Sequence, residues 1–235
     1  MTETIVALDL PSHTAALGLV DELGTAVSWY KVGSPLFTRS GPAIVRQLRD
    51  RGKKVFLDLK FHDIPSTTAN AVESAAALDV QMLTLHASGG STMMRTARDA
   101  VGDDGPRLLA VTLLTSFGPA EIGSVWQRNI TSVPDEVLRL AELSREAGMH
   151  GVVASPLETA AVRQRMGSDF IIVNPGIRPN RGLREDQVRI ATPAGAARAG
   201  ADYVVIGRPI LEAEDRPGTL ERILAELSDA ATLAP

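Results

Sequence analysis

The sequence predicts an α/β protein with a (β/α)8 TIM barrel fold, and three observations lead to this expectation. Short aliphatic runs alternate with amphipathic stretches from one end of the chain to the other, as parallel βα units require. Eight such runs can be distinguished, and 235 residues are about what one barrel needs. No linker or abrupt change of composition divides the chain, so residues 1–235 are expected to form a single domain.

The expected elements follow one another regularly. Several strands are continuously apolar, which is typical of parallel strands covered on both faces. The expected strands are Thr4–Leu10, Ser28–Gly33, Lys54–Lys60, Met82–Ala87, Leu108–Leu114, Gly151–Ser155, Phe170–Asn174 and Tyr203–Gly207. The expected helices are Thr14–Leu23, Pro35–Arg51, Ser66–Leu78, Thr92–Val101, Pro134–Ala147, Leu157–Met166, Pro193–Ala199 and Leu220–Ser228.

Two connections are longer than a barrel needs, at residues 116–133 and 176–192. Loops that follow barrel strands form the active-site face, and long loops there usually have a function. The alternative is that both are tolerated surface insertions.

Composition excludes several classes of function. The chain is 44% hydrophobic and 22% charged, so a packed core is expected, while a net charge of -4 and only 4% aromatic residues disfavour nucleic-acid binding. Cysteine is absent, which excludes disulfides and thiolate catalysis. No apolar run approaches the roughly 20 residues that span a membrane, and the N-terminus lacks a basic signal-peptide region. A cytoplasmic enzyme or binding protein is expected.

Charged residues interrupt the apolar strands near their carboxyl ends. Asp9 and Lys31 lie in the first two strands, and Asp58 and Lys60 end the third. Residues two apart on a strand point to the same side, so Asp58 and Lys60 are expected to project together at the barrel mouth. Buried ions are costly unless paired, so the group indicates an electrostatic site. The alternative is a salt bridge that only caps the strand ends.

Two further sets of residues have a local explanation beside a functional one. Asp63 precedes Ile64-Pro65 and could be a helix N-cap, and Thr67 could be an ordinary first-turn residue. Gly207 and Arg208 end the eighth strand, where barrels frequently bind phosphate. Upstream, Arg178 and Gln187 lie in the long seventh loop; each alone would be read as an exposed polar side chain.

Metal and nucleotide motifs are not recognisable. The four histidines show no metal-ligand spacing, and P-loop and GxGxxG fingerprints are absent. His62 and His86, near strand ends, are interpreted as supporting or structural residues.

The pattern Asp58-x-Lys60-x-x-Asp63, followed by Ile64-Pro65 and Thr67, resembles the signature of the orotidine 5′-phosphate decarboxylase family, in its bacterial branch. The resemblance covers nearly the whole chain. It also includes Asp9, Lys31, Leu114-Thr115-Ser116, Pro175-Gly-Ile-Arg178-Pro and Ile206-Gly-Arg-Pro. Asn174 departs from the pattern, because threonine is common there in relatives, and we expect no contact with substrate from it.

The resemblance implies a carboxy-lyase that converts orotidine 5′-phosphate (OMP) to UMP in pyrimidine biosynthesis, without a metal or cofactor. Lys60 would protonate C6 of the pyrimidine, and Asp58 would repel the substrate carboxylate. Lys31 and Asp9 would hold the ribose hydroxyls.

The remaining roles also come from the family. A homodimer is implied, in which Asp63 and Thr67 complete the partner's site. Thr115 and Ser116 would face the pyrimidine edge. The phosphate would be bound by Arg178, Gln187, Gly207 and Arg208.

Three rival interpretations remain. Hexulose-phosphate synthases and ketogulonate-phosphate decarboxylases share the Asp-x-Lys-x-x-Asp pattern. Both use magnesium, however, and both have an acidic residue where this chain has Lys31, so Lys31 argues against them. Ribulose-phosphate epimerases have metal-binding histidines that are not recognisable here. A catalytically inactive barrel that senses nucleotides is disfavoured by the intact charged and phosphate motifs.

Overall fold

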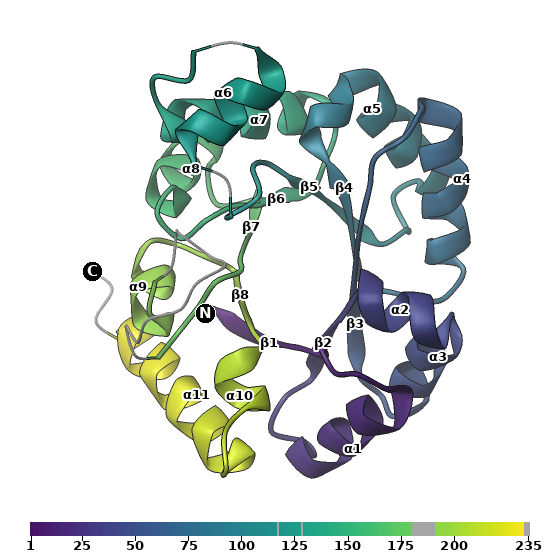
Figure 1. The fold of residues 1–235 in the computed structure, drawn as a ribbon, viewed down its shortest axis with the longest axis vertical. Helices are drawn as coiled ribbons and strands as arrows, with labels where there is room; N and C mark the ends of the chain where they lie inside the picture. The colour runs from purple at the N-terminus through teal and green to yellow at the C-terminus, as the bar shows by residue number, and fades with distance from the viewer. Residues whose placement is uncertain (117, 128, 180–190, 233–235) are drawn as a thin grey trace.

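Eight parallel strands close into a barrel in sequence order, with helices around the outside (Figure 1). The computed structural model describes residues 1–116, 118–127, 129–179 and 191–232. The strands are β1 Glu3–Ala7, β2 Trp29–Gly33, β3 Lys54–Phe61, β4 Met82–His86, β5 Arg107–Val111, β6 Gly151–Val153, β7 Ile171–Asn174 and β8 Tyr203–Ile206. The predicted fold class and all eight strand positions are confirmed. The observed strands β1 and β5 end three residues earlier than predicted, because the chain already turns into the loops of the barrel mouth.

The helices also follow the predicted order, with some differences. They are α1 His13–Leu23, α2 Ser34–Ser40, α3 Ala43–Asp50, α4 Pro65–Ala76, α5 Gly90–Val101, α6 Pro119–Trp126, α7 Val133–Glu146, α8 Thr159–Met166, α9 Pro193–Arg198, α10 Arg208–Leu211 and α11 Arg216–Thr232, with a 3-10 turn η1 at Ala87–Gly89. One helix expected over residues 35–51 is instead two, because Gly41 adopts a φ of 59° that ends α2. The long connection after β5 contains α6, which sequence reasoning missed. No described helix is long and apolar enough to cross a membrane.

Side chains alternate between the barrel interior and the layer beneath the helices. The larger cluster, which includes Val6, Tyr30 and Leu57, packs between strands and helices. The smaller cluster, which includes Ile5, Trp29 and Phe56, fills the interior of the barrel. Residues further along the inward-facing rows are therefore directed to the carboxyl-terminal mouth.

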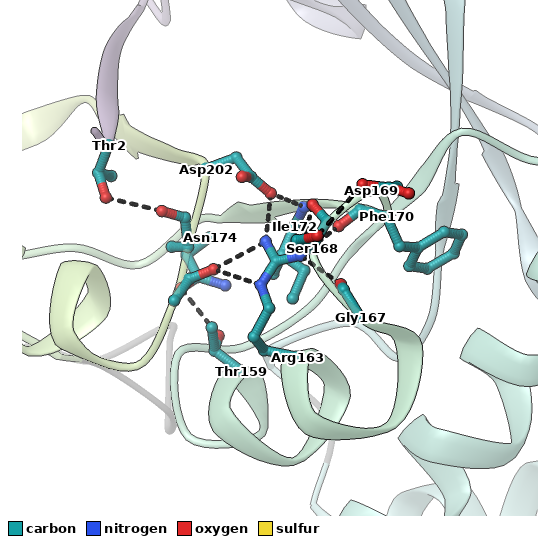
Figure 2. Close-up of polar contacts among 12 residues, drawn as sticks. Thr2, Thr159, Arg163, Gly167, Ser168, Asp169, Phe170, Ile172, Asn174 and Asp202 are labelled. Atoms are coloured by element: carbon teal, nitrogen blue, oxygen red, sulfur yellow. Dashed lines mark hydrogen bonds and ion pairs between the residues drawn. The ribbon is translucent and has the colours of Figure 1, made fainter.

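At the opposite, amino-terminal end of the barrel, Arg163 extends from α8 toward the connections that lead into β7 and β8 (Figure 2). Its guanidinium forms an ion pair of 2.6 Å with Asp202, the residue before β8. It also donates to the backbone carbonyls of Gly167, Ser168, Phe170 and Gly200. Because Asp202 additionally accepts from the backbone N–H of Ile172, this cluster joins the starts of β7 and β8. Sequence reasoning missed it.

Candidate active site

A cavity of about 720 Å³ lies at the carboxyl ends of the strands. Most of the residues singled out from the sequence line it. These are Asp9, Lys31, Asp58, Lys60, Thr115, Arg178, Gly207 and Arg208. The strand-end residues of a TIM barrel converge on this face whatever their separation in sequence, which explains why distant motifs meet here.

Four charged side chains form an alternating row along one side of the cavity. Lys31 Nζ lies 3.1 Å from Asp9 Oδ1 and 3.7 Å from Asp58 Oδ2, and Lys60 Nζ lies 2.7 Å from the same Asp58 oxygen. The row crosses from the end of β1 to the end of β3. Each ammonium therefore has a carboxylate beside it, as paired charges in a partly apolar site require.

Asp58 is the most enclosed member of this row, with 8% of its surface exposed. Burial by itself raises its pKa, but the charges of Lys31 and Lys60 and hydrogen bonds from Lys60 and Thr84 outweigh burial and hold the pKa below its ordinary value. Asp58 is therefore an anion at neutral pH, although it is almost out of contact with solvent.

The third strand is irregular where these residues lie. A regular strand was expected to place Asp58 and Lys60 on one side, and the two side chains do meet. However, the pairing of β3 with β4 shifts register between Leu57 and Phe61, and Lys60 has a φ of 53°. A lysine in this left-handed region is strained, and such strain is concentrated at functional sites. The predicted contact between Asp58 and Lys60 is therefore confirmed, but the regular alternation of side chains along a strand does not by itself explain it.

Two residues that support the row were not identified from the sequence. Thr84 donates its hydroxyl proton to Asp58 and accepts from the backbone N–H of Lys60. Gly33 leaves room for the lysine of β2, since a Cβ there would lie 3.0 Å from Lys31 Nζ and 3.5 Å from Asp9 Oδ1. A polar residue within the apolar run of β4 was the available signal for Thr84.

The cavity is also lined by two arginines and by the turn into α10. Gly207 precedes α10, and Pro209 occupies its first turn, as the sequence indicated. Arg208 and Arg178 both line the cavity. The buried Nε of Arg178 has no hydrogen-bond partner among the described residues. Gln187 lies outside the described residues.

Three predicted site residues do not line the cavity of their own chain. Ser116, Asp63 and Thr67 are exposed. Helix α4 starts at Pro65 with Ile64 as its N-cap, so the alternative in which Asp63 caps the helix is wrong; its carboxylate instead accepts from the N–H of Ile64 at 2.7 Å. The described contacts therefore give Asp63 no role in the cavity of its own chain.

The two histidines near strand ends lie beside the cavity. The rings of His62 and His86 are 5.4 Å apart and line a separate pocket of about 230 Å³ under α6. Burial, and then the charges of His62 and Lys60, lower the pKa of His86. In the part of the chain that the structure describes, no three His, Asp or Glu side chains are grouped to hold a metal ion.

Asn174, the departure from the expected pattern, is turned away from the cavity. Its buried amide donates to the carbonyl of Ala154 and accepts from Thr159. Asn174 therefore links β7 to α8 instead of facing the cavity.

The chain is similar to known proteins along nearly its whole length. The model of the orotidine 5′-phosphate decarboxylase / HUMPS family matches residues 2–223. The chain belongs to this family. An orotidine 5′-phosphate decarboxylase of Nitrosospira multiformis is 48% identical over 225 residues, which cover 96% of the chain and 93% of the relative. One of Pelobacter propionicus is 50% identical over 227 residues, covering 95% and 94%.

Solved structures give the same family relationship. The orotidine 5′-phosphate decarboxylase of Lactobacillus acidophilus superposes with a TM-score of 0.84 at 36% identity, covering 97% of this chain and 99% of that one. The relatives named decarboxylases are carboxy-lyases, and the chain shares their family along nearly its whole length.

Proposed function

We propose that this protein is an orotidine 5′-phosphate decarboxylase that converts OMP to UMP and carbon dioxide, the last step in forming UMP. The observation that carries the proposal is the row Asp9–Lys31–Asp58–Lys60 in a cavity that two arginines also line. Close relatives with this name support the substrate.

The charged row and the two arginines suit different parts of the substrate. The phosphate would bind at Gly207, Arg208 and Arg178, where backbone approach and guanidinium groups favour an anion. Gln187 would join them. The ribose hydroxyls would bind Asp9 and Lys31, and Thr115 and Ser116 would face the pyrimidine edge.

The chemistry takes place at C6 of the pyrimidine. Cleavage of the bond to the carboxylate releases carbon dioxide and leaves the bonding electron pair on C6. Lys60 Nζ would stabilise this charge and then transfer a proton to the carbon. Asp58, held ionised next to Lys60, would repel the departing carboxylate in the bound substrate. The proposal needs no metal or cofactor, since the lysine supplies the positive charge.

The exposed position of Asp63 and Thr67 supports a homodimer in which both residues reach the partner's site. Between them in sequence, the large apolar side chain of Ile64 is 64% exposed. A second copy of the chain would cover it.

Shared sites can be tested by complementation. Lys60→Ala and Asp63→Asn homodimers should each be nearly inactive, because each lacks one residue of every site. Heterodimers should regain up to about half of the wild-type rate, since one of the two sites then contains both residues. Verified heterodimers without any recovery would refute a shared site.

The position of Lys31 supports this function over the magnesium-dependent activities of the same superfamily. Its ammonium lies between two carboxylates, so a cation of the protein itself already compensates their charge. The direct test follows the loss of absorbance as OMP becomes UMP, with and without a chelator. Unchanged turnover in the chelator is expected; abolished turnover would contradict the proposal.

A further inference from the structure

The pairing between β3 and β4 is disrupted at the mouth of the barrel. Phe56 pairs with Met82 and Leu57 with Leu83, but the next pair joins Phe61 to Leu85. Four residue steps of β3, from 57 to 61, therefore run beside two steps of β4, from 83 to 85. The three residues of β3 in between lie opposite a single residue, Thr84.

The Thr84 side chain fills the gap in this ladder. Its hydroxyl accepts from the backbone N–H of Lys60 at 2.9 Å and donates to Asp58 Oδ1 at 2.9 Å, and the residue is completely buried. The backbone N–H can only donate and an ionised carboxylate can only accept, so both contacts have a fixed direction. One hydroxyl thus joins the backbone of one charged residue to the side chain of the other.

The backbone of Lys60 needs such support. Its φ of 53° is unfavourable for a residue with a Cβ, and a strained conformation persists only when the surroundings hold it. The bulge removes the regular strand partner of the Lys60 N–H, and Thr84 provides the replacement.

We infer that Thr84 is a positioning residue for the proposed decarboxylation, which holds the Lys60 backbone and the Asp58 carboxylate in a fixed relation through its hydroxyl. The inference rests on the proposed function for its effect on rate, but the contact itself is a property of the free protein. Thr84 does not line the cavity among the described residues, so it acts through Asp58 and Lys60.

Matched variants separate the hydroxyl from the volume of the side chain. Thr84→Val removes the hydroxyl at nearly constant shape and should lower kcat for OMP at least about tenfold, because small misplacements of reacting groups are costly. The Kd for UMP should stay within about twofold, since phosphate and ribose contacts are untouched. Thr84→Ser should recover most of the lost rate.

The control is Thr4→Val. Thr4 is also a buried strand threonine, but its hydroxyl has no described partner, so kcat should not change. A loss smaller than tenfold in Thr84→Val, or a serine variant as slow as the valine variant, would overturn the inference. If Thr84→Val does not fold, Thr84→Ala replaces it with the same expectations.

A second measurement does not depend on activity. Hydrogen exchange of the Lys60 amide in free protein should accelerate at least about tenfold in Thr84→Val but not in Thr84→Ser. Unchanged exchange would overturn the inference. Wild-type protein that does not decarboxylate OMP would instead refute the proposed function, and the exchange result would still decide whether Thr84 holds Lys60.

Discussion

The two ends of the barrel use similar charged groups in opposite ways. At the amino-terminal end, the guanidinium of Arg163 donates to four carbonyls and to Asp202. At the mouth, Lys60 Nζ has Asp58 as its one partner among the described residues, although an ammonium carries three donors. The first arrangement is saturated by the protein itself, whereas the second faces a cavity. A charged side chain thus stabilises the fold where its contacts are complete and can serve a ligand where they are not.

The largest expected contrast comes from removing the lysine at the mouth. Lys60→Ala should lower kcat by about 10⁴-fold or more, because it removes both the proton donor and the charge next to C6. Unfolding temperature and UMP binding should change little, since Asp58 keeps Lys31 as a partner. Turnover, calorimetry and UMP titration measure these effects; retained turnover would refute the assignment of the proton donor.

The reverse result is expected at the other end. Arg163→Ala removes the ion-pair partner of Asp202 and the side-chain donor to four carbonyls, and should lower the free energy of unfolding by about 2–4 kcal/mol. The kcat of the folded protein should stay close to wild type. Urea unfolding and turnover below the transition test this, and a large fall in kcat without destabilisation would break the distinction between the two ends.

A smaller effect on activity is expected from crowding the row at the mouth. The Cβ in Gly33→Ala would lie 3.0 Å from Lys31 Nζ, so the ammonium must shift by a few tenths of an ångström. The backbone φ of -90° tolerates alanine, so the fold should be maintained. We expect kcat/KM for OMP to fall about tenfold. Gly18→Ala, at a helix position with open space around it, is the control.

The smallest effect concerns one histidine at each end. Burial lowers the pKa of His86, with His62 and Lys60 adding to the effect, and burial lowers that of His150, with Arg98 and Arg107 adding. The unfolded chain then binds protons near pH 6.5 that the folded chain does not, so stability is complete above this pH and decreases below it. Urea unfolding at pH 7.5, 6.5 and 5.5 measures the slope.

Replacing the histidine at the amino-terminal end sharpens this test. His150→Gln keeps an acceptor for the N–H of Leu108 but removes one titrating group, so the slope with pH should decrease. An unchanged slope would show that His150 does not contribute. A decrease would assign part of the pH dependence to the amino-terminal end of the barrel.

The sequence by itself determined the barrel, because alternating apolar runs and amphipathic stretches report burial directly, residue by residue. It also determined which charged residues meet, because strand ends of a parallel barrel converge on one face. Asp9, Lys31, Asp58 and Lys60 were identified in this way.

Only the tertiary structure decided how those residues are held. The bulge in β3, the left-handed Lys60 and the support from Thr84 depend on the register between two strands, which local sequence does not encode. The Arg163 cluster is likewise formed by carbonyls, which every residue carries, and so leaves no sequence pattern. Sequence patterns report which side chains are buried, whereas the orientation of backbone donors and acceptors is set by packing across the whole barrel.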